Sequence, residues 1–344
     1  MSIKRGLTYD DVLLVPQYSD IRSRREIDIG STLTGPSDFC DVHLSLPLIG
    51  SPMDTISESQ MGIAMWRAGA LAIIHRYNTI KKQCTLADEA FFGGAAGTAA
   101  AIGTSADYLD RATALYDVGV RILCVDVAHG HHILMKEALH ELRNVFGDAV
   151  HIMAGNVATS EGYNDLVDWG ADSVRCNIGG GSICSTRIQT GHGVPGLQTI
   201  IDCAKGERRA PIIADGGIRN AGDIVKALAA GADFVMLGSL LAGTDETPGD
   251  VITTRKGQFK AYRGMASKDA QVEWRGKTAS LEGISTTIPC KGPVEDVLSE
   301  LGRGIRSGFS YSGAHNLEQL QKKVRFIYQT SHGRMESTTH ILHK

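Results

Sequence analysis

The chain has 344 residues, of which 42% are hydrophobic and 21% are charged, values ordinary for a globular protein with a sizeable core. Its 35 Lys and Arg and 38 Asp and Glu side chains give a net charge of −3 without a long basic block, so nucleic acid is not an expected partner. No apolar run reaches the roughly 18 to 20 residues of a membrane span, and residues 1–6 lack the apolar stretch of a secretory signal. The seven cysteines are scattered and form no C-x-x-C pair, which argues against a disulfide framework or a zinc site. We therefore expect a cytoplasmic protein with no membrane partner.

The predicted elements begin with an N-terminal arm, residues 1–45, followed by a repeated pattern of short apolar strands and helical stretches. Glycines mark the ends of four helical stretches, at Gly69, Gly119, Gly170 and Gly231, because glycine enters the left-handed conformation without steric cost. After the last strand, residues 245–292 show weak periodicity and predict an active-site flap, before a closing helix at about residues 294–307. The strands themselves are predicted at residues 47–50, 71–75, 99–103, 121–126, 151–155, 173–178, 211–215 and 234–238.

This alternation predicts the fold class. Short, continuous apolar strands separated by helices indicate buried parallel strands with right-handed crossovers. An open doubly wound sheet is the alternative, but such a sheet gathers its functional residues at one switch point. Here, residues suited to chemistry follow many of the strands, as in a closed barrel. We therefore expect residues 1–344 to form a single α/β catalytic domain, a (β/α)8 TIM barrel with an N-terminal arm and a flap.

A glycine-rich loop after the sixth strand, residues 179–187 (GGGSICSTR), carries the candidate nucleophile Cys184. The thiolate is the reactive form of cysteine, and nearby backbone N–H groups or Arg187 can lower the pKa of this thiol. The glycines allow the main chain to wrap closely around a ligand or ion. A buried structural cysteine is the alternative for Cys184. That structural interpretation is our prediction for Cys124, Cys176 and Cys203.

Two glycine turns follow the seventh and eighth strands, Asp215-Gly216-Gly217 and Gly238-Ser239. The corresponding corner of a barrel commonly binds phosphate through backbone amides. Asp215 would repel a phosphate at close range, so we expect its partner to be a pair of ribose hydroxyls. Simple turn chemistry is the alternative interpretation of both segments.

Further polar residues are expected at the barrel mouth. Asp126 ends the fourth strand, and His129, His131 and His132 follow it. A metal site is the weaker interpretation of these histidines, because no carboxylate or cysteine lies at a ligand spacing; solvated or helix-capping roles are favoured. Glu282 in the flap is a candidate for proton transfer if the flap closes, and an idle charged loop residue is the alternative.

With these residues laid out, the chain resembles the IMP dehydrogenase / GMP reductase family over nearly its whole length. The resemblance implies a purine nucleoside monophosphate as substrate, a nicotinamide dinucleotide as hydride partner, and addition of the cysteine to C2 of the purine ring. It also implies a homotetramer. The matching stretches are residues 6–14 (GLTYDDVLL), 51–55 (SPMDT), 154–157 (AGNV), 181–187 (GSICSTR), 213–218 (IADGGI), 236–239 (MLGS) and 262–265 (YRGM).

The resemblance also implies roles for individual residues. Cys184 would be the nucleophile, and Thr186 and Glu282 would assist proton transfer as ammonia leaves. The substrate would be bound by Ser182, Asp215, Gly217, Gly238, Ser239, Tyr262, Gly264 and Met265. The cofactor would be bound by Arg76, Asp126, Ala128 and Asn156. Backbone carbonyls of Gly179, Gly181 and Cys184 would hold a monovalent cation, K⁺ in the family.

One departure bears on the cation. The family's usual Gly-x-Gly-Pro-Gly-Ser is Asn177-Ile178-Gly179-Gly180-Gly181-Ser182 in this chain. Loss of the proline predicts a more flexible loop, which puts the dependence on an ion in doubt.

The flap bears most directly on the choice between the two branches of the family. Only 17 steps separate Met265 from Glu282, fewer than in the dehydrogenases, and no Arg-Tyr pair for water activation occurs among them; the single arginine is Arg275. Only 23 residues separate His75 from Ala99, so the paired CBS modules usual in dehydrogenases are missing.

Shorter motifs divide between the branches. Residues 23–28, 288–292 and 310–314 resemble reductases, whereas residues 51–58 and 243–244 look more like a dehydrogenase. With the flap weighted most, we predict NADPH-dependent reductive deamination of GMP, or of a close guanine nucleotide analogue, to IMP and ammonia. The alternatives are an IMP dehydrogenase without CBS modules, using Arg275 to activate water, and a purine-nucleotide sensor without turnover.

Overall fold

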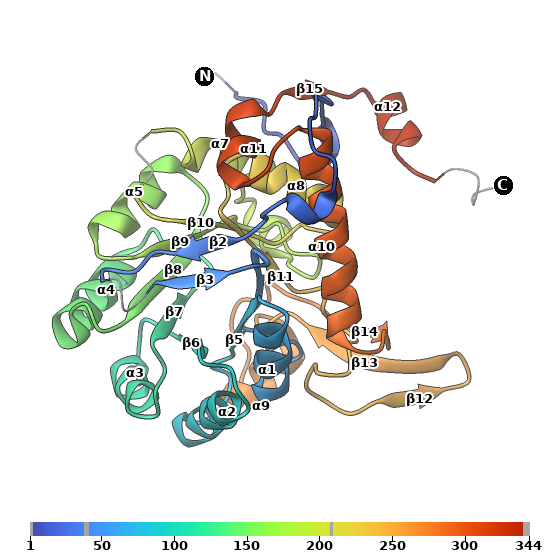
Figure 1. Cartoon of the computed structure of the whole chain (residues 1–344). Helices are drawn as coiled ribbons and strands as arrows, with labels where there is room; N and C mark the ends of the chain where they lie inside the picture. Colours follow the sequence, from blue (N-terminus) through green and yellow to red (C-terminus); the bar gives the residue numbers. More distant parts are fainter. Residues whose placement is uncertain (1–2, 38–40, 207–208, 340–344) are drawn as a thin grey trace.

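The computed structural model describes residues 3–37, 41–206 and 209–339. Eight parallel strands close a barrel, each beside the next in chain order (Figure 1). The first and last of them pair directly, with Leu48 opposite Val235, which excludes the open sheet and confirms the TIM barrel. The predicted strand ends differ from the observed ones by at most two residues. The strands are β4 (Leu48–Gly50), β5 (Leu71–Ile74), β6 (Ala99–Ile102), β7 (Ile122–Asp126), β8 (His151–Val157), β9 (Ser173–Cys176), β10 (Ile212–Asp215) and β11 (Phe234–Leu237).

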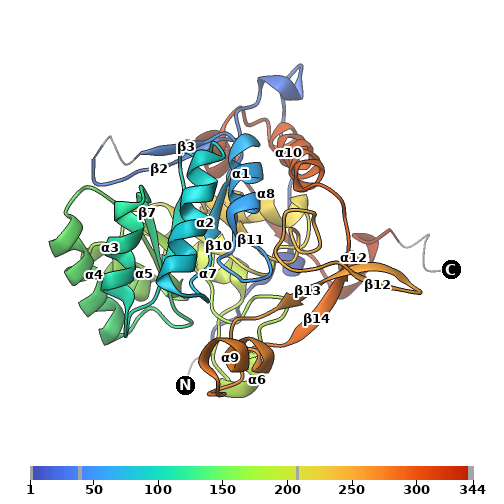
Figure 2. The same ribbon diagram turned by 90° about the horizontal axis from the view of Figure 1, so that it is seen from below.

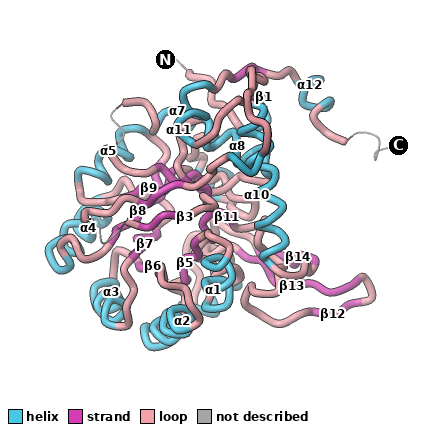
Figure 3. The backbone as a smooth tube through the Cα atoms, in the orientation of Figure 1, coloured by secondary structure: helices cyan, strands magenta, loops and turns pink. Residues whose placement is uncertain are grey.

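Helices surround these strands, as the outer ring of tubes in Figure 3 shows. The four glycines predicted to end helices all adopt positive φ, between +79° and +117°, which explains their placement before β5, β7, β9 and β11. Helix α10 was predicted to end near residue 307 but continues to Tyr311. The ring comprises α1 (Ser59–Arg67), α2 (Ile80–Phe92), α3 (Tyr108–Asp117), α4 (Ile133–Phe146), α5 (Ser160–Asp168), α7 (Gly196–Cys203), α8 (Ala221–Ala229) and α10 (Val294–Tyr311).

Two layers of apolar side chains form the core, because successive residues of a strand point to opposite faces. On β5, Ile73 belongs to the cluster inside the barrel, whereas Ala72 and Ile74 pack against the helices outside. The hairpin of β2 (Ser31–Leu33) and β3 (Val42–Leu44) adds buried Leu33 and Leu44 to the inner cluster. The barrel interior is therefore packed and leaves the ligand site to the strand ends.

The two terminal regions lie together on the barrel. In the arm, η1 (Tyr9–Asp11), β1 (Val12–Leu14) and η2 (Arg24–Glu26) precede the β2–β3 hairpin. After α10 come α11 (Leu317–Lys323), β15 (Phe326–Tyr328) and α12 (Ser331–Glu336). Strands β1 and β15 pair antiparallel, and η2 packs against α10. Among the helices of the described residues, none has the length and apolar character needed to cross a membrane.

The flap has regular structure that its weak sequence periodicity did not predict. Strands β12 (Ile252–Thr254), β13 (Gly257–Arg263) and β14 (Ser285–Pro289) form an antiparallel sheet, and α9 (Lys268–Arg275) lies between the last two. In Figure 2, α9 and α6 (Thr186–Thr190), the short helix that follows Cys184, lie at the same edge of the molecule, and an antiparallel bridge joins Cys184 to Gly283 of the flap. The flap therefore folds back over the glycine-rich loop, as expected of a lid.

Candidate active site

A cavity of about 330 Å³ opens at the carboxyl ends of the barrel strands, within the size range of small-ligand sites. Every residue predicted to bind substrate, cofactor or cation, or to act in catalysis, lines it. They come from the ends of five barrel strands, the glycine-rich loop and the flap, and many are distant from one another in sequence. The structure thus brings the predicted site together, while the individual roles of these residues stay predictions.

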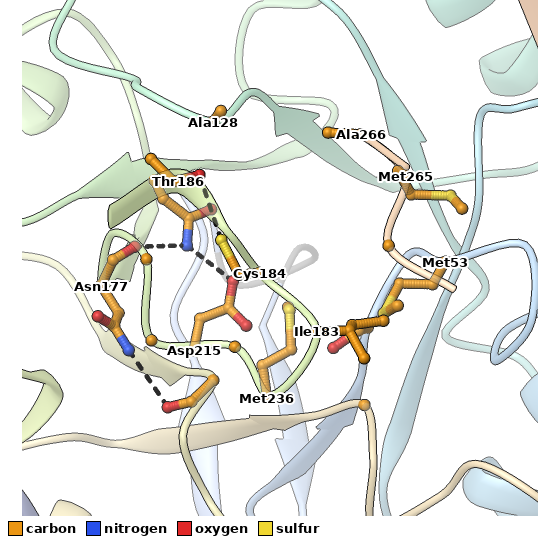
Figure 4. Close-up of a pocket in the computed structure, with 18 of the residues that line it drawn as sticks. Met53, Ala128, Asn177, Ile183, Cys184, Thr186, Asp215, Met236, Met265 and Ala266 are labelled. Atoms are coloured by element: carbon orange, nitrogen blue, oxygen red, sulfur yellow. Dashed lines mark hydrogen bonds between the residues drawn. The ribbon is translucent and has the colours of Figure 1, made fainter. Parts of the chain in front are cut away.

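The Cys184 thiol lies in this cavity, half-buried, at the entry to α6 (Figure 4). The Cys184 N–H donates to the Gly181 carbonyl at 3.2 Å, which closes a turn around the thiol. Arg187, considered above as an activating cation, instead donates to the carbonyls of Ile178 (3.3 Å) and Val194 (2.6 Å). Arg187 therefore ties the two ends of the loop together.

A hydrogen-bonded relay joins the thiol to the flap. The Cys184 Sγ–H donates to Thr186 Oγ1 at 3.2 Å, and the Thr186 hydroxyl donates to Glu282 Oε2 at 2.7 Å. The other carboxylate oxygen, Oε1, accepts from the Ser280 hydroxyl at 3.0 Å. The relay runs in one direction from sulfur to carboxylate, which is the geometry required of a nucleophile and its base.

Backbone pairing holds the flap over the loop. Cys184 and Gly283 form an antiparallel bridge, the Ser185 N–H donates to the Glu282 carbonyl at 2.9 Å, and the Ile284 N–H donates to the Ile183 carbonyl at 3.0 Å. Gly283 is required here, because a Cβ on it would lie 3.0 Å from the Ser267 nitrogen. Glu282 is therefore positioned by main-chain bonds on both sides.

A buried arginine organises the opposite wall. Arg175 on β9 donates to Asp215 Oδ2 at 2.8 Å and to Asp126 Oδ1 at 2.5 Å, and Asn156 Nδ2 donates to Asp215 Oδ2 at 2.8 Å. Burial disfavours the charge of Arg175, but the carboxylates of Asp215 and Asp126 outweigh it and raise its pKa well above the ordinary value. In the described part of the chain, every hydrogen bond to the Asp215 carboxylate reaches Oδ2, so Oδ1 is left for a ligand.

The predicted phosphate corner also assembles. Tyr262 on β13 reaches Ser182 with its hydroxyl at 3.3 Å, and Gly238 lies beneath it, since a Cβ there would be 3.1 Å from the Tyr262 oxygen. Burial raises the pKa of Tyr262, although its hydrogen bonds with Ser182 and Ser239 act in the other direction. Tyr262 therefore remains a neutral donor, suited to an anion.

The turn after β10 packs directly on the glycine-rich loop. Gly217 has a φ of +79°, and a Cβ on it would lie 3.2 Å from the Gly180 carbonyl oxygen. Asn177 donates through Nδ2 to the Gly216 carbonyl at 3.2 Å, and a Cβ on Gly180 would lie only 2.1 Å from that same nitrogen. The Asn177 side chain thus occupies space that a proline at position 180 would need. This explains why the chain has Asn177 in place of the family's glycine and also Gly180 in place of its proline.

The chain is similar to known proteins both in sequence and in structure. The family model of the IMP dehydrogenase / GMP reductase domain matches residues 6–340. IMP dehydrogenase from Nitrosopumilus maritimus is 33% identical, with 99% of each chain covered. The chain belongs to the IMP dehydrogenase / GMP reductase family. Enzymes of this family are oxidoreductases that act on purine nucleotides with a nicotinamide cofactor.

Relatives carrying either enzyme name resemble this family member to a similar degree. GMP reductase from Leishmania major is 31% identical over 100% of this chain and 98% of its own, and IMP dehydrogenase from Cryptosporidium parvum is 35% identical over 98% and 96%. A crystal structure of GMP reductase from Trypanosoma brucei, a cysteine-to-alanine variant in complex with guanosine 5′-monophosphate, superimposes with a TM-score of 0.90. It is 31% identical, with 98% of both chains covered.

The alignments also bear on the missing CBS modules. The N. maritimus dehydrogenase and the L. major reductase align over 477 and 488 positions, more than the 344 residues of this chain. Relatives bearing either name therefore carry residues that this family member lacks. The missing insert by itself does not separate the two branches.

The predicted cofactor side of the site lies around Asp126. Arg76 donates from Nη2 to the Asp126 carbonyl at 3.1 Å, and its guanidinium stacks 5.0 Å from the centre of the Tyr77 ring. Its Nε is buried without a hydrogen-bond partner among the described atoms, 3.8 Å from Asp126 Oδ2. Trp274 of α9 meets the Tyr77 ring edge-on, so the flap also contacts this side.

The expected cation ligands fit only in part. The Gly181 carbonyl already accepts the Cys184 N–H, and Gly179 is held at a φ of +76°. The described residues contain no group of three or more His, Cys, Asp or Glu suited to a metal ion. A carbonyl-bound monovalent cation would not require such a group, and its site stays a prediction.

Of the histidines after β7, His132 takes the capping role favoured above, whereas the pairing of His131 with a carboxylate was not predicted. His132 caps α4 by accepting the Leu134 N–H at 3.2 Å, and His131 Nε2 lies 2.7 Å from Asp165. Burial raises the pKa of Cys124 to about 12 and raises that of Cys176 as well, so both thiols are structural.

Sequence reasoning missed two residues that shape the site, Arg175 and Asn177. Arg175 stands in an otherwise apolar strand that is buried on both faces. An arginine there has to be paired, and that requirement was a usable signal of a nearby carboxylate. Asn177 follows the same strand in the left-handed region, with a φ of +152°, and nothing in the linear sequence marks its contact with the turn after β10.

The side chain of Arg275, the alternative water activator, lies outside the described residues.

Proposed function

We propose that the protein is a GMP reductase, which converts GMP and NADPH to IMP, NADP⁺ and ammonia. The flap carries the proposal. It returns Glu282 to Thr186 and the Cys184 thiol after only 17 steps, and those steps contain no Arg-Tyr pair for activating water. The relay alone would serve proton transfer in either branch, so the missing pair is what favours deamination.

The relay first deprotonates the nucleophile and later protonates the amine that leaves as ammonia. The Cys184 proton passes through the Thr186 hydroxyl to Glu282, and the thiolate forms a bond to C2 of the guanine ring. Solvent protonates the ring nitrogen that receives the electron pair. Glu282 then returns its proton through Thr186 to the exocyclic amine, the C2–N bond breaks and ammonia leaves. After C2 gains a hydride, the C2–S bond breaks and returns the electron pair to sulfur.

Binding of the nucleotide uses the opposite wall and the phosphate corner. The free Oδ1 of Asp215 accepts from the ribose hydroxyls, while the hydrogen bond from Arg175 orients that carboxylate. Ser182, Gly217, Gly238, Ser239 and Tyr262 surround the phosphate with hydroxyl and main-chain donors. Gly264 and Met265 close over the nucleotide from the flap, where the Asp54 N–H contacts the Met265 sulfur at 3.4 Å.

The cofactor would lie against Arg76, Asp126, Ala128 and Asn156, where it would supply the hydride to C2. The partly exposed guanidinium of Arg76 gives this wall a donor for the amide or phosphate groups of a dinucleotide. Residues 1–45 and 245–292 belong to the same catalytic unit in this proposal. The proposal also includes assembly as a homotetramer, a cytoplasmic location, and K⁺ bound by the carbonyls of Gly179, Gly181 and Cys184.

Cofactor absorbance tests the reaction directly. The purified protein is incubated with GMP plus NADPH and, separately, with IMP plus NAD. NADPH consumption with stoichiometric ammonia is expected. A Cys184→Ala variant should bind GMP but turn nothing over, and full turnover by this variant would remove the nucleophile from the proposal.

IMP dehydrogenase is the second candidate, favoured by the 33% and 35% identities to two enzymes of that name, against 31% for the L. major reductase. NADH formation with XMP in the second incubation would establish it and overturn the reductase. Nucleotide binding without turnover in either incubation would indicate a purine-nucleotide sensor.

A further inference from the structure

A second basic cavity lies away from the active site, between the N-terminal arm and α10. Four arginines line this depression of about 470 Å³: Arg24, Arg25, Arg303 and Arg306. No carboxylate oxygen of the described residues lies within 4 Å of any of these guanidinium groups. Within the part of the chain that the structure describes, the only side-chain hydrogen bond of these four arginines joins Arg303 to Ser299 at 2.9 Å. Four unpaired positive charges thus share one depression in a chain of net charge −3.

The local structure fixes the backbone that carries these arginines, whereas the side chains of Arg24, Arg25 and Arg303 are exposed. Arg24 and Arg25 belong to η2, which Ser23 caps by accepting the Arg25 N–H at 3.3 Å and which is followed by buried Ile27. The other two are three residues apart on an 18-residue helix, so they project from one face of it. Like charges repel, and a cluster of cations with no carboxylate oxygen within 4 Å among the described residues is suited to an anion, although Glu26 and Glu300 lie on the same two helices.

The cavity faces the end of the barrel opposite the active site. A Cβ on Gly302 would lie 3.4 Å from both Arg306 Nη1 and Leu46 Cδ1, and Leu46 precedes β4 by two residues. Ser51, just beyond the other end of β4, lines the active site. In Figure 2, α10 reaches the upper edge of the molecule, whereas α6 and α9 lie at the lower edge. An anion bound here would therefore not be the substrate in its catalytic position.

We propose that this arginine cavity binds a small polyphosphate-bearing anion, a nucleoside di- or triphosphate or a free polyphosphate. The guanidinium fork matches phosphate oxygens in pairs, and four such groups match several adjacent negative charges. The volume lies within the range of nucleotide-sized sites. Arginine planes also stack on bases, so the nucleoside forms and the free polyphosphate are two sources of the same chemistry.

Isothermal titration with tripolyphosphate and, separately, with ATP tests the proposal on the full-length protein at fixed ionic strength. Saturating GMP is present in both titrations to occupy the active site. The test variants are Arg24→Gln/Arg25→Gln and Arg303→Gln/Arg306→Gln. The control is Arg255→Gln/Arg325→Gln, which removes the same charge at exposed positions elsewhere.

We expect saturable binding to the parent protein, at least tenfold weaker binding in both test variants, and a change of less than twofold in the control. Tighter binding of ATP than of tripolyphosphate would identify a nucleotide as the ligand, and equal affinity would identify the phosphate chain alone. No saturable binding, or equal binding in all variants, would overturn the proposal. Loss of self-association in the test variants without anion binding would assign the arginines to an interface and likewise overturn it.

Discussion

Replacing Glu282 by glutamine separates proton transfer from positioning in the proposed relay. The amide oxygen of Glu282→Gln can still accept the Thr186 hydroxyl, now 2.7 Å from the carboxylate, and the main-chain bonds of the flap are untouched. The amide cannot take up the Cys184 proton or return it to the amine. We therefore expect GMP to bind nearly as before and turnover to fall.

The expected loss of kcat follows from the role of Glu282 in proton transfer. General acid–base catalysis contributes roughly 10²- to 10⁴-fold. Since solvent can reach the half-buried thiol and replace part of the relay, the lower half of that range, about 10²- to 10³-fold in kcat, is expected. This corresponds to about 3 to 4 kcal/mol of transition-state stabilisation.

Steady-state kinetics with GMP and NADPH provide the assay, together with the Kd of GMP for each protein. Asp269→Asn is the matched control, because it makes the same carboxylate-to-amide change at an exposed position of the same flap. The control should keep its kcat within twofold. A Glu282→Gln enzyme with more than half the parent kcat would refute the relay, and an equal loss in both variants would show that the flap responds to charge alone.

Three further substitutions test the supporting structure. Arg175→Met removes a buried arginine that pairs with both Asp126 and Asp215, and leaves Asp215 with no ion pair. It should cost about 3 to 5 kcal/mol in urea unfolding, against about 0 to 1 for Arg209→Met at an exposed pair; equal costs would contradict this account. Burial and then Arg143 lower the pKa of His151 to about 3, so its neutral form stabilises the fold above pH 6.5, and about 2 kcal/mol should be lost by pH 5. His151→Gln should flatten the stability profile between pH 6.5 and 3, and an unchanged slope would exclude this histidine. Gly180→Ala should weaken GMP binding through its clash with Asn177, and adding Asn177→Gly should restore it; titration without rescue would count against the clash.

Much of the fold could be predicted from the amino-acid sequence. Apolar strands followed by helices that end in Gly69, Gly119, Gly170 or Gly231 are local patterns, because strand burial and left-handed glycine both depend on neighbouring residues. The flap strands were not predicted. Strands β12 and β14 are three and five residues long and mostly exposed, so their pairing with β13 leaves little periodicity in the sequence.

The sequence by itself determined the barrel, the family and many of the residues that line the cavity, because these follow from short contiguous motifs, most of them at strand ends. Only the tertiary structure decided how those residues act on one another. It joined Cys184 and Thr186 to Glu282, almost a hundred residues away, and it turned Arg187 to the loop carbonyls and not to the thiol. It also placed Arg175 between two carboxylates from different strands. Such contacts depend on barrel closure and flap return, which bring distant segments within hydrogen-bonding distance, and no local pattern encodes those distances.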